Sequence, residues 1–182
     1  MTKEELGKLY PIEVVEYDSE WPMLFEMEKQ NLLEILGSSI ALRIEHIGST
    51  AVSNLLAKPT VDILVEIQKN EDINELIISK MIPNGYIHMK EQQNHLMFVK
   101  GYTPTGLSKE SFHIHMGSID QDWLWDRLYF RDYLRMNPSV AKEYENLKKE
   151  LASIYKHDRE AYTESKASFI KRITELAKDE MK

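Results

Sequence analysis

Residues 43–67, RIEHIGSTAVSNLLAKPTVDILVEI, constrain the fold more than any other part of the chain. The first residues of this stretch are rich in apolar and β-branched side chains, which favour a strand ending at Ile47. The pattern is then broken by residue types that allow a tight turn, namely Gly48, Ser49 and Thr50. Residues 60–67 follow as a second strand, in which β-branched side chains alternate with Asp62, Leu64 and Glu66. We therefore expect Asp62 to lie on a rigid strand, on the face opposite the β-branched residues.

The remaining periodicities predict helices and strands on both sides of this stretch. Apolar residues recur at helical spacing over residues 21–36 and 71–81, the first run stopped by Gly37 and the second by Pro83 and Gly85. Residues 96–102 and 111–118 predict a hairpin around the loop TPTGLSK, and residues 12–17, IEVVEY, predict an edge strand or an extended arm. Three more helices are expected at residues 121–136, 138–155 and 160–178. The order predicts an α+β fold, a mixed β-sheet with helices packed on one face and a C-terminal helical section.

Composition limits the classes of protein that this chain can belong to. Its 182 residues suit a single domain, with residues 1–118 as a sheet lobe and 119–182 as a helical section if it divides. A formal charge of −7 argues against a protein that coats nucleic acid, and no apolar run is long enough to span a membrane. Cysteine is absent, which excludes disulfides and thiolate metal sites, and the start MTKEELGKLY has no apolar segment of a secretory signal. We expect a cytoplasmic protein.

The turn at residues 48–50 is a candidate phosphate site. Its backbone N–H groups and two hydroxyls, from Ser49 and Thr50, could bind an anion, although such a turn is often only a turn and a helix cap. Lys58 precedes Pro59, whose ring restricts it to extended geometry. Its ammonium either meets the same phosphate or is solvated.

Asp62 and two histidines form a candidate metal site. His113 and His115 lie two residues apart on one predicted strand, so both side chains point the same way and could converge on one ion. With Asp62 they would form a set of two histidines and one carboxylate, and the alternative is a strand with a polar face. Glu45 and His46 are accessory candidates, of which only one can share a face with Asp62. We expect this face to line the largest polar cleft.

Cationic side chains on the C-terminal helices are further candidates. Arginines recur every four residues at Arg127, Arg131 and Arg135, which gives either an anion-binding stripe or internal salt bridges with Asp126 and Asp132. Lys148 and Lys166 each follow a tyrosine by four residues, at the border of an apolar face. Each either extends to water or reaches into the phosphate cleft.

The motifs HIGSTAV, AKP before the strand with Asp62, FHIHM and FRDYLR, with the later Tyr/Lys helices, resemble the GrpB family over nearly the whole chain. Residues 43–67 are also similar to the start of the nucleotidyltransferase fold. The resemblance implies that Gly48 and Ser49 cradle phosphates and that Asp62 is catalytic through a bound divalent metal, Mg, Mn or Zn. The sequence departs from the superfamily at position 64, where leucine replaces the usual second acid. Glu66 shares the face but lies roughly 13 Å along the strand, too far to hold the same ion.

Three functions fit these residues. The first is a protein that binds a nucleotide or other phosphate compound with a divalent metal and, if catalytic, transfers a nucleotidyl or phosphoryl group. The second is a non-catalytic ligand-binding or regulatory module, which Leu64 favours. The third is a mononuclear metallohydrolase that uses Asp62, His113 and His115.

Overall fold

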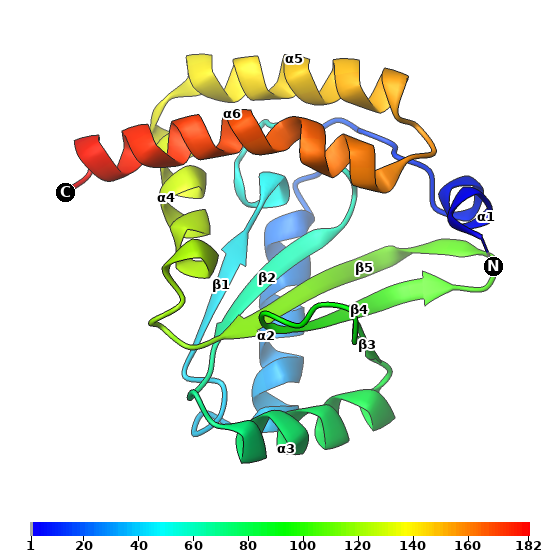
Figure 1. Cartoon of the computed structure of the whole chain (residues 1–182), viewed down its shortest axis with the longest axis vertical. Coiled ribbons are helices and arrows are strands. Elements are labelled where there is room, and N and C mark those ends of the chain that lie inside the picture. The colour runs from blue at the N-terminus through cyan, green and yellow to red at the C-terminus, as the bar shows by residue number, and fades with distance from the viewer. Residues whose placement is uncertain (1) are drawn as a thin grey trace.

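The computed structural model describes residues 2–182 and contains a five-stranded sheet surrounded by helices (Figure 1). The strands are β1 (Arg43–Ile47), β2 (Val61–Glu66), β3 (Ile87–His88), β4 (Leu96–Thr103) and β5 (Gly106–Gly117). The α-helices are α1 (Lys3–Leu9), α2 (Trp21–Leu36), α3 (Glu71–Met81), α4 (Asp122–Met136), α5 (Pro138–Ile154) and α6 (Arg159–Glu180). Two short 3-10 helices, η1 (Ser49–Ala51) and η2 (Ile82–Asn84), complete the elements.

The sheet is mixed and has the strand order β1-β2-β5-β4-β3. β2 and β5 are parallel, whereas the other neighbours are antiparallel. In the parallel pair, Asp62 lies beside His113 and Leu64 beside His115. Residues that are paired in register point to the same side of a sheet, so these four side chains share one face, as the alternation predicted.

The two faces of β2 belong to different cores. Val61, Ile63 and Val65 are at most 1% exposed and pack in the cluster that holds the apolar sides of α2 and α3. On the opposite face Leu64 is buried against Leu124 and Trp125 of α4. Asp62 and Leu64 therefore lie on the side that faces the C-terminal helices.

The C-terminal helices close the end of the sheet at which β1 ends and β2 begins (Figure 1). α5 and α6 pack along each other there, and the loop after β1 inserts Val52 and Leu55 among their apolar residues. Asp62, the second residue of β2, consequently lies near these helices. No helix within residues 2–182 is long and apolar enough to cross a membrane.

The α+β prediction with a mixed sheet is confirmed, but helices cover both faces of the sheet instead of one, α2 and α3 on one face and α4 on the other. The helices at residues 21–36 and 71–81 have the predicted ends. The first helix, however, is α1 and not α2: Thr2 and Glu5 form a reciprocal cap that starts it. Residues 12–17 form an extended arm rather than a strand, held by one bridge between Val15 and Ala57. β5 begins at Gly106 instead of residue 111, since the hairpin extends across an irregularity near Gly101.

Candidate functional site

The turn after β1 is built around a contact between Gly48 and Asp62. Gly48 has a φ of +73°, and a Cβ added to it would lie 2.6 Å from Oδ2 of Asp62. Glycine is therefore required twice, for its backbone conformation and for this close approach. The contact brings the predicted phosphate turn and the predicted metal ligand together.

Asp62 begins a chain of polar contacts across the sheet. Nδ1 of His113 lies 3.3 Å from Oδ1 of Asp62, and Nε2 of His113 lies 2.5 Å from the hydroxyl of Tyr102. That hydroxyl accepts a hydrogen bond of 3.0 Å from Arg159 at the start of α6. If Nδ1 of His113 carries the proton, each member donates to the next, from Arg159 to Asp62. These contacts fix the orientation of the Asp62 carboxylate.

The charges around Asp62 favour its ionised form. Burial alone would raise the pKa of this carboxyl, but the hydrogen bond and charge of His113, followed by His115 and Lys58, hold the pKa well below its usual range. The Asp62 side chain is 31% exposed. An ionised, partly accessible carboxylate is suited to holding a cation.

His115 contacts a different partner from the one predicted. Its Nδ1 lies 2.9 Å from Nε2 of His95, and the two rings are stacked. Burial, and then the charge of Arg127, lower the pKa of His115 well below its usual value. In residues 2–182 no three side chains of His, Cys, Asp or Glu are grouped so that they could hold a metal ion. Asp62 and His113 are thus in contact while His115 is engaged elsewhere, and metal binding stays a prediction.

Lysines from three elements gather on the helical side of the turn; we call Lys58, Lys148 and Lys166 the lysine cluster. Lys148 of α5 donates to Oγ of Ser49 at 2.9 Å and also to the carbonyl of Leu56. Nζ of Lys58 and Nζ of Lys166 lie 5.5 and 4.3 Å from the ring centre of Tyr162. Of these two lysines, Lys148 reaches the turn, as one of the predicted alternatives has it, whereas Lys166 lies over the ring of Tyr162.

The lysine cluster carries positive charge that the protein does not neutralise. Within residues 2–182 none of the three ammonium groups has a carboxylate within 4.0 Å. Burial, followed by the charge of a neighbouring lysine, lowers the pKa of Lys148 and of Lys166 to about 7. Burial and then Arg159 lower the pKa of Lys58. An anion in this cleft would relieve their mutual repulsion.

Other predicted accessory residues have structural partners. Arg131 donates to Glu45 at 2.8 Å, to Asp132 at 2.7 Å and to the carbonyl of His46 at 3.0 Å. The His46 ring stacks on Phe25 on the opposite side of the sheet. Glu45 alone therefore shares the face of Asp62, and it is paired with an arginine.

The two hydroxyls of the turn also have different partners. Oγ1 of Thr50 is buried and lies 2.8 Å from Nε2 of His46, whose pKa burial lowers to about 4. Ser49, in contrast, has its hydroxyl beside Lys148. Of the two predicted hydroxyls, only that of Ser49 belongs to the lysine cluster.

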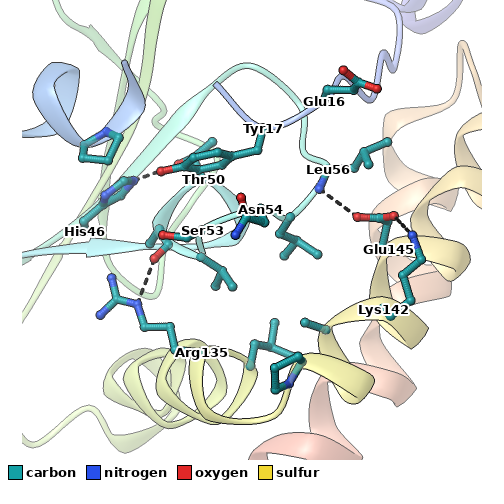
Figure 2. A pocket seen from close by; sticks show the side chains of 17 residues that line it. Glu16, Tyr17, His46, Thr50, Ser53, Asn54, Leu56, Arg135, Lys142 and Glu145 are labelled. Carbon is teal, nitrogen blue, oxygen red and sulfur yellow. Dashed lines mark hydrogen bonds and ion pairs between the residues drawn. The ribbon is translucent and has the colours of Figure 1, made fainter. Parts of the chain in front are cut away.

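A cavity of about 810 Å³ is lined in part by the loop that follows β1 (Figure 2). Its lining includes Tyr17, Thr50, Asn54, Arg135 and Glu145, but neither Asp62 nor the two histidines. The prediction that Asp62, His113 and His115 line a large polar cleft does not hold for this cavity. The turn separates this cavity from Asp62, because Thr50 and Ala51 line the cavity while Gly48 touches the carboxylate.

Sequence reasoning missed several residues that surround Asp62. Tyr102 and Arg159 complete the polar chain, His95 pairs with His115, and Tyr144 and Tyr162 lie under the lysines. Tyr144 and Tyr162 carried a signal, since each precedes one of the predicted lysines by four residues. Tyr102, Arg159 and His95 had none, because only the strand register and the packing of α6 bring them to the site.

Comparison with known proteins agrees with this architecture. The model of the family described as GrpB protein matches residues 11–176. The chain is 35% identical over 162 residues to the glutamate-rich protein GrpB of Alkalihalophilus pseudofirmus, a match that covers 88% of this chain and 92% of that protein. It is also 35% identical over 173 residues to UPF0157 protein YqkA of Bacillus subtilis, with 93% of this chain covered. The match spans about half of YqkA, 49% of its length.

Solved structures give the same result at the level of the fold. The crystal structure of conserved protein GrpB from Enterococcus faecalis superposes with a TM-score of 0.80 at 35% identity, covering 93% of this chain and 99% of that one. The Cid1 poly(U) polymerase superposes with a TM-score of 0.54 at 14% identity, covering 83% of this chain and 46% of the polymerase. The second likeness concerns the nucleotidyltransferase-like fold alone, whereas the family model and the relatives place this chain in the GrpB family.

Proposed function

We propose that this protein binds a nucleotide or another phosphate compound, together with one divalent metal ion, between the sheet and helices α5 and α6. The observation that carries the proposal is the lysine cluster: Lys148 is buried, Lys58 and Lys166 are half-buried, and none of the three amines has a carboxylate partner within residues 2–182. Burying unpaired charges costs several kcal/mol per ion, so such clusters are expected where a ligand supplies the opposite charge. Phosphate is the anion whose charge best matches several amines.

The residues around the cluster have complementary roles in this proposal. Gly48 allows the turn to approach Asp62, and Ser49 with Lys148 would hold a phosphate oxygen. Asp62, oriented by His113, would hold the metal, which would neutralise charge on the phosphates when bound. Tyr162 adds support, because it is completely buried and its hydroxyl has no hydrogen-bond partner within residues 2–182. Buried hydroxyls are nearly always bonded, so an unbonded one on a ring that two lysines contact suits a site completed by a ligand.

The fold neighbour is consistent with this choice of ligand. One structure of the Cid1 poly(U) polymerase was solved with MgGTP bound and another with the UTP analogue UMPNPP. We carry over the ligand class, a nucleotide with a divalent ion, and not the polymerase reaction.

A specific observation favours binding without efficient catalysis. Position 64, which holds the usual second acid of the superfamily, is a leucine with no exposed surface, packed under Leu124 and Trp125. A second carboxylate there would be buried among apolar side chains, so two metal ions cannot be held as in two-metal enzymes. We predict at most one divalent ion per chain without nucleotide, and slow transfer if any.

The test is a screen of thermal stability against nucleotides and inorganic phosphates, with and without Mg²⁺, Mn²⁺ or Zn²⁺. A ligand that binds only the native state raises the melting temperature. A nucleotide-dependent effect of Mg²⁺ or Mn²⁺ would support the proposal, and stabilisation by nucleotide alone would support the binding module. Tight stoichiometric Zn²⁺ without nucleotide would favour the metallohydrolase instead.

The variant Asp62→Asn identifies the metal ligand. It keeps the shape of the side chain but removes the charge, so we expect metal binding to be lost, the fold to persist, and phosphate to bind without metal at least as well as before. Glu66→Gln, on the same face four residues along the strand, is the matched control. Metal affinity retained in Asp62→Asn, or two ions bound per chain, would contradict this assignment.

A further inference from the structure

Arg127 differs from the two arginines that follow it on α4. It lies three residues after Leu124, which packs on Leu64, and four before Arg131, which reaches Glu45 on β1. Residues three and four apart share one side of a helix, so Arg127 lies on the side of α4 that covers the sheet. Beneath this side, Leu64 is flanked by Asp62 on its own strand and by His115 on the next. Arg127 thus belongs to the same face as Asp62 but comes from a different helix than the lysines.

Arg127 also lacks the partners that its neighbours have. Arg131 pairs with Glu45 and Asp132, and Arg135 donates to the carbonyl of Ala51 at 2.9 Å. For Arg127 the described part of the chain offers no carboxylate within 4.0 Å and no hydrogen-bond acceptor. Burial lowers its pKa, and Asp62 is the charge that counters this effect. A guanidinium that is partly withdrawn from water, and unpaired, suits an anion from outside the protein.

Two imidazoles, those of His95 and His115, lie on the side of the sheet that α4 covers. His95 and His115 are hydrogen bonded to each other at 2.9 Å, and the exposed Trp123 packs edge-on against the His95 ring. Burial and then the charge of Arg127 lower the pKa of His95 to about 4, and the pKa of His115 also falls. Of these three side chains only Arg127 carries a permanent positive charge.

We propose that Arg127, with His95 and His115 beside it, forms a second anion subsite that binds a carboxylate or phosphate group of a second substrate. The inference rests on the proposed function, because the first substrate occupies the lysine cluster. Asp62 then lies between two positive regions, one on α5 and α6 and one on α4. The second substrate is accordingly an anionic small molecule rather than a neutral one.

Arg127→Met tests the subsite, because methionine keeps a long side chain without charge or donors. Removing an unpaired charge should leave the melting temperature unchanged or raise it. A large fall in melting temperature would show that Arg127 is structural and would overturn the proposal. Arg172→Met is the matched control: Arg172 is on the surface, 61% exposed, and 3.7 Å from Glu143. Arg127→Lys, which restores the charge, should recover part of any lost binding.

Equilibrium dialysis against inorganic phosphate would count the sites in wild type, Arg127→Met and Lys166→Met. We expect two phosphates per wild-type chain, one weakened roughly tenfold or more in Arg127→Met and the other in Lys166→Met, since a hydrogen bond to a charged group contributes about 1.5–3 kcal/mol. Unchanged binding in Arg127→Met with loss in Lys166→Met would overturn the second subsite alone. Loss of binding in Arg127→Met with unchanged binding in Lys166→Met would overturn the proposed phosphate site alone. A wild-type protein that binds no phosphate would overturn both.

A competition arm identifies the source of the anion. Acetate that displaces only the phosphate sensitive to Arg127→Met would indicate a carboxylate substrate. Failure of acetate to displace it would indicate a phosphate substrate. Either result supports the subsite, provided that Arg172→Met behaves as wild type.

Discussion

Arg131 contacts His46, before Gly48, and the lysine cluster contacts Ser49, after it, and these cations differ in which groups neutralise them. Arg131, on the side of β1, is 10% exposed and reaches two carboxylates and a carbonyl. The lysine cluster, on the side of α5 and α6, has neighbouring lysines and aromatic rings but no carboxylate partner within residues 2–182. The difference is between a cation whose partners belong to the protein and cations for which we propose a ligand as the partner. Burial alone does not separate them, because Lys148 and Arg131 are both buried.

The largest expected effect is on stability, and it follows from removing Arg131. Arg131→Met would remove three hydrogen bonds of a buried guanidinium, to Glu45, Asp132 and the carbonyl of His46, and would leave Glu45 with Arg43 alone, so we expect a loss of about 3 kcal/mol in the free energy of unfolding. Urea denaturation measures this loss, with Arg172→Met as a surface control expected to change by less than about 0.5 kcal/mol. Phosphate affinity of the folded fraction should be unchanged. A stable Arg131→Met protein with weakened phosphate binding would remove the distinction between the two groups.

A substitution in the lysine cluster should lower phosphate affinity and leave stability unchanged, the opposite of Arg131→Met. Lys166→Met is expected to weaken phosphate binding roughly tenfold, because it removes about 1.5–3 kcal/mol of a charged contact. Stability should not fall, since no carboxylate is left behind. Calorimetric titration and urea denaturation of the same samples give both quantities. Lost stability with normal phosphate affinity would place Lys166 among the structural cations.

The pH dependence of stability sharpens this prediction. The pKa of Lys166 is about 7 in the folded protein and near its ordinary value of 10.5 in the unfolded chain. Between these values the unfolded chain binds more protons, so the free energy of unfolding should rise with pH from about 7 to about 10.5. The rise should be smaller in Lys166→Met. Phosphate binding should weaken over the same window, because the free amine loses its proton.

The sequence predicted the strand of Asp62 and its neighbours because local patterns decide them. Alternation over residues 60–67 placed Asp62 and Leu64 on one face, and the His-x-His spacing placed His113 and His115 on the same face. The alternation did not reveal that His115 pairs with His95, or that Tyr102 and Arg159 continue the series of polar contacts that starts at Asp62. Those contacts depend on the register of β4 against β5 and on where α6 begins, which no local pattern encodes.

The position of the lysines needed the same long-range information. Helical spacing put Lys148 and Lys166 at the edge of an apolar face, which fits either solvent or a cleft. For Lys148 the loop of residues 48–57 decides between them, because Lys148 donates to Ser49 and to the Leu56 carbonyl. Lys166 lies over the ring of Tyr162, in the preceding turn of its own helix. α1 was missed for a different reason: seven residues carry too little periodicity, and the capping pair Thr2 and Glu5 was its one clear signal.

The smallest expected effect tests whether the turn itself belongs to the ligand site. Ser49→Ala removes a hydroxyl that contributes one hydrogen bond, so phosphate affinity should fall by about 1 kcal/mol, roughly fivefold. The fold should persist, because Lys148 keeps its bond to the Leu56 carbonyl. Ser53→Ala is the matched control, since Ser53 lies in the same loop and lines the cavity (Figure 2). Calorimetry should find normal phosphate affinity in Ser53→Ala. If Ser49→Ala instead lost stability and kept its affinity, the hydroxyl would serve only to hold Lys148, and the ligand would lie with Lys58 and Lys166 alone.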